Sequence, residues 1–243
     1  MLNIFNEIDR LQEEINNYKP FDSSQLEQVK EYYRIGLTYT SNALEANSLT
    51  ETETKIVLED GITIGGKPLK DHFEAVGHGE AFDYMYTLIQ KKSIAESDIK
   101  TVHRIFYYRI DIKNAGHYRK VKIYITGSKY PLPLPTEIQR CMREFTLKLN
   151  EMKDQIHPVA FSALAHKELV FIHPFIDGNG RIARLIMNLL LLQKGYTLVL
   201  IPPIVRPEYI RFLEKAHEDE RPFIEFIARM VKETQNDYLR LFG

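Results

Sequence analysis

The sequence has very little of several features that mark particular classes of protein. Cys141 is the only cysteine among 243 residues, so an intrachain disulfide is impossible and a reducing compartment is expected. The formal net charge is −1, which gives no general attraction to nucleic acid or to anionic membranes. The longest apolar run, residues 185–192, includes Asn188 and is far too short to cross a bilayer. Residues 1–19 mix acids and bases and lack the apolar centre of a signal peptide. We therefore expect a cytoplasmic protein with neither nucleic-acid nor membrane partners.

The composition is that of an ordinary globular protein, with 44% hydrophobic and 27% charged residues. The chain length favours one large domain, or one domain with an appendage, and it can build a core without a metal or a disulfide. Apolar residues recur mostly at helical spacing. They predict helices over approximately residues 3–17 (ending near Lys19-Pro20), 24–46, 50–59, 69–91, 96–108, 136–152, 157–172, 179–193, 207–217 and 222–241.

Two helix starts carry capping signals. Asp22-Ser23-Ser24 precedes the second predicted helix and supplies good N-cap residues. Thr50 and Glu53 have the spacing of a capping box at the start of the third.

One segment departs from the helical pattern. Residues 118–130 (YRKVKIYITGSKY) alternate apolar and polar residues and contain a turn signal at Thr126-Gly127-Ser128, which predicts a β-hairpin. Pro131, Pro133 and Pro135 then favour an extended exit. The expected fold is mainly α, a helical bundle with one projecting β-hairpin.

Residues 173–184 read His-Pro-Phe-Ile-Asp-Gly-Asn-Gly-Arg-Ile-Ala-Arg and concentrate groups with chemical uses. Pro174 disfavours helical geometry at His173, so a helix should end there. Gly178, Asn179 and Gly180 are the residue types best able to adopt positive φ. A loop of this kind can turn its N–H groups inward as an anion-binding nest, and the helix that follows adds positive potential.

The side chains of the same segment fit a phosphate substrate. Arg181 and Arg184 are three residues apart on one helix face, and arginine matches phosphate oxygens with a planar fork. Asp177 offers a hard oxygen ligand suited to Mg²⁺. His173 can accept a proton near neutral pH. Each feature alone is commonly structural, but no structural need brings all of them into twelve residues.

This segment resembles the complete motif of the Fic family, H-x-F-x-D/E-G-N-G-R-x-x-R, without a substitution. The resemblance implies transfer of AMP from ATP to a protein hydroxyl, with release of pyrophosphate. In this family His173 would deprotonate the hydroxyl, Asp177 would bind Mg²⁺, and Arg184 would pair with the γ-phosphate. The cradle for the α- and β-phosphates would consist of Gly178, Asn179, Gly180 and Arg181.

The predicted hairpin resembles the flap of Fic proteins, which begins here at Gly116-His117-Tyr118-Arg119. The resemblance implies that Tyr118, Val121 and Ile123 dock an extended target segment by β-augmentation. Ile123 would also contact the nucleotide.

Residues 41–45 (SNALE) resemble the inhibitory motif S/T-x-x-x-E-G/N of the same family. Ser41 and Glu45 lie four apart on one helical face, and Glu45 would occupy the place of the γ-phosphate on Arg184. Ala46 stands where the motif has Gly or Asn. Alanine favours continuing the helix, and this affects the orientation of Glu45. His217 stands where some relatives carry an adenine-contacting Asn.

The resemblance divides the chain into N-terminal helices at 1–60, including an inhibitory helix at about 24–46, and a Fic core with C-terminal helices at 61–243. Gly61 to Lys67 fits the first seven positions of a P-loop. Pro68 stands where the P-loop needs a Ser or Thr hydroxyl, so the segment is interpreted as a turn.

Several alternatives stay open at the level of sequence. The same site could remove AMP, with Glu45 positioning a water, or it could transfer UMP, phosphocholine or phosphate. The chain could also be a non-catalytic regulatory or binding module. The target protein is not encoded in the motif. Because Fic proteins often self-associate and self-modify, a homo-oligomer and the chain itself as a target are candidates.

Overall fold

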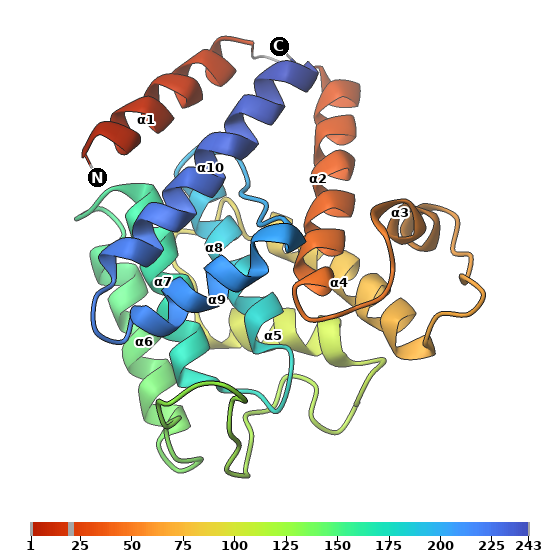
Figure 1. Cartoon of the computed structure of the whole chain (residues 1–243), viewed down its shortest axis with the longest axis vertical. Coiled ribbons are helices and arrows are strands. Elements are labelled where there is room, and N and C mark those ends of the chain that lie inside the picture. The colour runs from red at the N-terminus through yellow and green to blue at the C-terminus, as the bar shows by residue number, and fades with distance from the viewer. Residues whose placement is uncertain (1, 19–21, 243) are drawn as a thin grey trace.

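The computed structural model describes residues 2–18 and 22–242, and its regular structure in these ranges is entirely helical (Figure 1). The mainly α fold class is therefore confirmed. The elements in chain order are α1 (Leu2–Asn17), α2 (Ser23–Ala43), α3 (Glu51–Glu59), α4 (Leu69–Thr87), α5 (Glu96–Tyr107), α6 (Ile138–Met152), α7 (Pro158–Ile172), α8 (Asn179–Gln193), η1 (Pro203–Val205), α9 (Arg206–Lys215) and α10 (Arg221–Phe242). The predicted end of the first helix near Lys19-Pro20 lies outside the described residues.

Helix α8 is the centre of the molecule, and it packs most closely against α7. Its apolar run is buried from Leu185 to Leu191, and Asn188 within it is fully buried as well. The Asn188 amide group donates to the carbonyls of Arg184 and Val199 and accepts from the Val199 N–H at 2.7 Å. A polar residue is tolerated there because all its hydrogen-bonding groups are used. Among the described residues no helix is long and apolar enough to cross a membrane.

The first and last helices lie side by side, so both ends of the chain close over the same face (Figure 1). Ile8 and Ile15 of α1 are completely buried and share one apolar core with α10 and the central helices. The predicted boundary at residue 60 stays a prediction.

The predicted caps form as expected. The Asp22 side chain accepts from the N–H of Gln25, whose side chain accepts from the Asp22 N–H in return. Thr50 and Glu53 make the same reciprocal pair at the start of α3. Each box satisfies two N–H groups that an isolated helix end leaves open.

Helix α2 ends earlier than predicted, at Ala43 rather than Ala46. Ala46 adopts a left-handed backbone with φ 67°. The Asn47 N–H donates to Asn42 O at 3.1 Å and the Ala46 N–H to Ala43 O at 3.0 Å, which is the Schellman pattern of a helix end. The helix therefore terminates as it would with glycine at position 46, although alanine occupies that position.

The predicted β-hairpin over residues 118–130 is wrong. This segment is an irregular loop, and no strand occurs in residues 2–18 or 22–242 (Figure 1). A turn forms at its tip, where the Ser128 N–H donates to Ile125 O. The main chain near each end is bound by other partners, since Arg119 N–H donates to Pro174 O and Lys129 N–H to Glu214. Val121, Tyr124 and Ile125 are exposed, so the alternation of apolar and polar residues does not correspond to a buried and a solvent-facing side of a strand.

The glycine-rich segment 61–67 is a loop between α3 and α4. Lys67, the residue that a P-loop would use on phosphate, donates to the carbonyl of Ser48 and pairs with Glu53 at 3.2 Å. Pro68 is the cap residue that precedes α4. This arrangement agrees with the interpretation as a turn.

Candidate active site

The loop between α7 and α8 has the sharp turns that the sequence predicted. His173 ends α7 in a left-handed conformation with φ 49°, and Gly178 begins α8 with φ 81°. A side chain on Gly178 would lie 2.8 Å from the Phe106 ring, so both the backbone angle and the space require glycine there. The loop thus reverses direction within six residues and presents the N-terminus of α8.

Asn179 holds this loop closed from within. Its side chain accepts from the Phe175 N–H and donates to Phe175 O, both at 2.9 Å. The Phe175 ring is completely buried and stacks on His103 with ring centroids 3.7 Å apart. Asn179 therefore stabilises the loop by hydrogen bonds to its main chain, and Phe175 stabilises it by packing its ring into the core.

His103 on α5 binds the loop through its ring nitrogens. Its Nδ1 accepts from the Gly116 N–H at 2.9 Å, so the ring proton is on Nε2, which donates to Asp177 O at 3.2 Å. Burial lowers the pKa of His103 to about 4, so the ring is neutral at neutral pH. This histidine joins the start of the flap segment to the loop.

His173 is held in the tautomer that a general base needs. Its Nδ1 faces Val170 O at 3.2 Å, and because a carbonyl only accepts, Nδ1 carries the proton. Nε2 is then the unprotonated nitrogen. Burial lowers the pKa of His173 to about 4, which leaves the imidazole neutral at physiological pH.

Arg184 is among the largest fully buried side chains of the protein. Its Nε donates to Ser41 Oγ at 2.9 Å, and its NH2 donates to Ser41 O and to Glu45 Oε1, both at 2.8 Å. NH1 contacts the Tyr209 hydroxyl at 3.3 Å. Among the described residues Glu45 is the one carboxylate paired with Arg184. A buried cation depends on such an anion, because desolvation makes an unpaired charge costly.

Glu45 itself is stabilised as an anion. Burial acts to raise its pKa, but the charge and hydrogen bond of Arg184 outweigh burial, and the pKa is lowered overall. A side chain on Gly180 would lie 2.4 Å from Glu45 Oε1, so the carboxylate lies against the backbone of the glycine loop. The structure thus brings together Ser41, Glu45, Gly180 and Arg184.

Arg181 lies on the neighbouring face of α8 and is also buried. NH1 lies 2.8 Å from Glu74 on α4, and NH2 donates to Asp177 at 3.2 Å. The contact of NH1 with Glu74 has the distance of an ion pair but not the geometry of a hydrogen bond, and Nε has no hydrogen-bond acceptor. Buried donors without acceptors suit a site that receives an anion.

Asp177 can serve a divalent cation. Oδ1 accepts from the Gly178 N–H at 2.6 Å and from Arg181, while Oδ2 has only Lys70 nearby at 3.8 Å. No cluster of three or more potential metal ligands occurs in the part of the chain that the structure describes. One available carboxylate oxygen beside the glycine loop fits Mg²⁺, which usually takes one or two carboxylates together with substrate phosphates and water.

A cavity opens beside the loop, between the flap segment and α9. Glu45, His173, Gly180 and Tyr209 contribute to its wall, together with Ile125, Ser128, Tyr130, Leu132, Val170, Phe171, Ile210, Leu213, Glu214 and His217. The His217 ring lies between Phe171 and Tyr130, with centroid distances of 3.6 and 3.8 Å. The cavity is therefore charged at the glycine loop and largely apolar elsewhere.

The flap residues named from the sequence occupy different positions. Ile125 lines the cavity, whereas Ile123 does not. Val121 is 53% exposed and available to a partner. Tyr118 packs inward against Phe175, and its hydroxyl is buried without a hydrogen bond. The structure does not offer the Tyr118 ring to a docked segment.

Arg119 anchors the flap segment to the loop. Its guanidinium is buried and donates to the carbonyls of His173, Val121 and Pro133 at 2.8, 3.1 and 2.7 Å. The flap entry, the proline strap and His173 are thereby held together by one side chain. Sequence reasoning assigned no individual role to Arg119, His103, Glu74 or Tyr209, because each gains its meaning from partners far away in the chain.

The chain resembles known proteins over nearly its whole length. The sequence model of the Fic/DOC family matches residues 93–191. Protein adenylyltransferase Fic of Drosophila grimshawi is 40% identical over 204 residues, which cover 83% of this chain and 42% of the relative. The corresponding protein of Drosophila persimilis is 38% identical and covers 89% of this chain and 43% of the relative. The chain therefore spans less than half the length of these relatives.

Two solved structures share the fold. A fragment of Fic-1 from C. elegans has a TM-score of 0.89 and 30% identity, covering 98% of this chain and 71% of the fragment. A Fic domain containing signaling protein from Bacteroides thetaiotaomicron has a TM-score of 0.87 and 27% identity, covering 95% of each chain. With the complete motif folded around one loop and similarity on this scale, the chain belongs to the Fic family.

Proposed function

We propose that the protein is an adenylyltransferase that moves AMP from ATP to a hydroxyl group of a target protein. The observation that carries the proposal is the convergence of a neutral, correctly tautomeric His173 with the Gly178–Gly180 loop and two buried arginines. The curated relatives named protein adenylyltransferase support the same assignment. A cytoplasmic location, in keeping with the free thiol of Cys141, belongs to the same proposal.

His173 acts as the general base. Its Nε2 receives the proton of the target hydroxyl, whose oxygen then forms a bond to the α-phosphorus while the bond to pyrophosphate breaks. Because the Nδ1 proton is held by Val170 O, the ring cannot rotate its basic nitrogen away without losing that bond. Protonated Nε2 is the end state of this step.

The N-terminus of α8 and the two arginines hold the phosphates. Phosphoryl transfer depends mostly on positioning and charge, so these groups matter as much as the base. Arg181, whose buried Nε has no acceptor, would receive the α- and β-phosphates, and Arg184 the γ-phosphate. Asp177 would hold Mg²⁺, which neutralises phosphate charge when bound.

Glu45 is proposed to inhibit the enzyme by occupying Arg184. The ion pair at 2.8 Å uses the guanidinium edge that the γ-phosphate would need. Each ~1.4 kcal/mol of this pairing costs ATP about tenfold in productive binding. Ser41 keeps Arg184 in place whether or not Glu45 is engaged.

The test is AMP incorporation from labelled ATP with Mg²⁺, using wild type, Glu45→Gly, and Glu45→Gly combined with His173→Ala. Strong labelling of the chain or of lysate proteins by Glu45→Gly alone supports both assignments. Equal labelling by wild type and Glu45→Gly contradicts inhibition by Glu45. If Glu45→Gly accumulates no AMP and a pre-labelled target loses AMP only when Glu45 is present, the site works in the reverse direction.

A further inference from the structure

A second carboxylate lies under the phosphate cradle. Glu74 on α4 is 4% exposed, and its Oε1 lies 2.8 Å from Arg181 NH1. Arg181 has Asp177 as its other anionic partner, and that side chain is 42% exposed and directed toward solvent. Glu74 is therefore the buried, fixed partner of Arg181.

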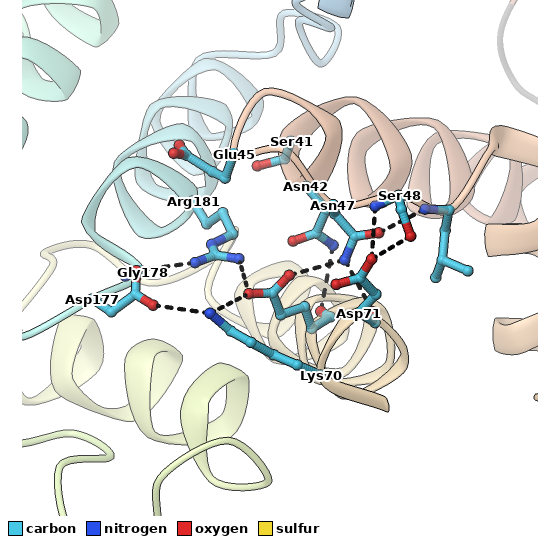
Figure 2. A network of polar contacts seen from close by, with 12 residues as sticks. Ser41, Asn42, Glu45, Asn47, Ser48, Lys70, Asp71, Asp177, Gly178 and Arg181 are labelled. Atoms are coloured by element: carbon cyan, nitrogen blue, oxygen red, sulfur yellow. Dashed lines mark hydrogen bonds and ion pairs between the residues drawn. The ribbon is translucent and has the colours of Figure 1, made fainter. Parts of the chain in front are cut away.

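The other oxygen of Glu74 holds a different part of the chain. Asn47 Nδ2 donates to Glu74 Oε2 at 2.9 Å and to Asp71 O at 3.1 Å. Ser48 donates to Asp71 Oδ2 through its N–H and its hydroxyl, at 2.8 and 2.6 Å. Figure 2 shows this network, with Asn47 and Ser48 near Asp71 and with Arg181 near Asp177.

The turn bound by Glu74 is also the turn that carries Glu45. Glu45 and Asn47 are separated only by Ala46, whose left-handed backbone places their side chains on different partners. Glu45 contacts Arg184, and Asn47 contacts Glu74, which contacts Arg181. One short turn is thereby connected to both arginines of α8.

We propose that Glu74 is a positioning residue that couples the inhibitory turn to the phosphate cradle, an inference that rests on the function proposed above. Its carboxylate sets the orientation of Arg181 through charge and the position of the Glu45 turn through Asn47. Loss of the Asn47 hydrogen bond loosens Glu45 without altering either Glu45 or Arg184. Loss of the Glu74 charge weakens phosphate binding through Arg181.

The coupling has a test that needs no nucleotide. Asn47→Asp keeps the acceptor used by the Leu49 N–H but sets a negative charge against Glu74. Amide hydrogen exchange of residues 44–49 should become about tenfold faster, the factor for a lost hydrogen bond. Combining Asn47→Asp with Glu74→Gln reverses donor and acceptor at this contact but leaves the Asp71 carbonyl without its donor, so the exchange should become clearly slower than in Asn47→Asp alone without reaching the wild-type rate.

The matched control is Asp83→Asn. Asp83 is another carboxylate on α4 and pairs with Arg34 of α2 at 3.0 Å, away from the turn. It should leave the exchange of residues 44–49 unchanged. Equal effects of Asp83→Asn and Asn47→Asp, or no recovery in the reversed pair, overturn the proposal.

Calorimetric binding of Mg·ATP separates the two roles of Glu74. In the Glu45→Gly background, Glu74→Gln should weaken binding about tenfold, whereas Asn47→Asp should change it little because inhibition is already absent. In the Glu45→Gly background, Asn47→Asp combined with Glu74→Gln should slow the exchange of the turn again but should not restore the affinity for Mg·ATP. A merely structural role of Glu74 would make both quantities recover together. If Glu45→Gly binds Mg·ATP equally well with and without Glu74→Gln, the proposal that Glu74 orients Arg181 is overturned. If Glu45→Gly binds no Mg·ATP at all, the proposed function fails, and the exchange experiment still decides the coupling.

Discussion

Glu45 Oε1 lies 2.8 Å from Arg184 NH2, at the single guanidinium group that is also held by the hydroxyl and the carbonyl of Ser41. The motif residues of α2 and α8 meet there although 139 positions separate them. Arg184 is 1% exposed, so an anion must accompany it, either Glu45 or a ligand. This need for an anion is the physical basis of the inhibition by Glu45 and of the γ-phosphate binding that we propose for Arg184.

Glu45→Gln should release part of the inhibition. Glutamine keeps an acceptor for Arg184 but removes the charge, so the affinity for Mg·ATP should rise in the order wild type, Glu45→Gln, Glu45→Gly. We expect about tenfold between neighbouring members if each loses about 1.4 kcal/mol of pairing. Titration calorimetry at constant Mg²⁺ measures this order. Identical affinities for Glu45→Gln and wild type would show that charge is not the basis of the inhibition. Glu51→Gln, at an exposed position of α3, serves as the control.

Ala46→Gly should stabilise the protein. Ala46 has φ 67°, where a side chain costs about 1–2 kcal/mol, and relief of this strain should exceed the loss of up to about 1 kcal/mol from added chain entropy. Urea unfolding should give an increase of about 0.5–1 kcal/mol. Ala43→Gly, three residues earlier at the end of α2, should instead destabilise by up to about 1 kcal/mol. Equal losses for both substitutions would contradict the left-handed conformation at position 46.

The free energy of unfolding should fall as the pH decreases from 6.5 to about 4. Burial lowers the pKa of His78 and His166 to about 3, and that of His103 and His173 to about 4. These folded-state pKa values lie below the unfolded value near 6.5, so the unfolded state binds more protons in this window and the stability present above pH 6.5 is lost on acidification.

Urea unfolding at pH 7, 6 and 5 measures the effect, with a slope of about 1.4 kcal/mol per pH unit for each histidine. His78→Asn, which keeps a partner for Thr38 at the position of Nδ1, should reduce the slope by one proton. A stability that stays constant between pH 6.5 and 5 would refute the buried neutral state of these rings. Transfer by Glu45→Gly should be independent of pH between 6 and 8, because His173 is already unprotonated there.

Arg119→Lys should separate target transfer from nucleotide binding. A lysine ammonium cannot reach the carbonyls of His173, Val121 and Pro133 together, so the flap loses its anchor and stability falls by about 2–3 kcal/mol. We expect transfer to a protein target to fall by about tenfold or more while Mg·ATP affinity changes less than about threefold. Lys120→Ala at the exposed neighbouring position should affect neither quantity. Equal losses of transfer and of nucleotide affinity would place Arg119 in the nucleotide site instead.

Much of the helical framework could be predicted because its causes are local. The limits of α8 agree with the prediction at both ends, since Gly178 and the apolar period determine them within a few residues. The capping boxes at Asp22 and Thr50 depend on spacings of three residues. The hairpin prediction failed for the converse reason. Strand pairing needs free main-chain groups, and in this segment Pro174 O accepts the N–H of Arg119 and Glu214 accepts the N–H of Lys129.

Ala46 illustrates a limit of local propensity. Alanine favours helix continuation, and the sequence alone predicts that α2 extends to it. The hydrogen bonds of Asn47 to Glu74 and of Ser48 to Asp71 pull the chain onto α4 and impose the left-handed turn. Tertiary contacts here overcome a preference of about 1 kcal/mol.

The chemical groups of the candidate site follow from the amino-acid order alone, because twelve consecutive residues carry the proposed base, the proposed metal ligand, the glycine loop and both arginines. That order also determined the helices whose caps and apolar periods are local. The partners of those groups depend on how distant segments pack together. Glu45 on Arg184, Glu74 on Arg181 and His103 beneath Asp177 are contacts between distant segments, and their strength depends on burial, which no local pattern specifies.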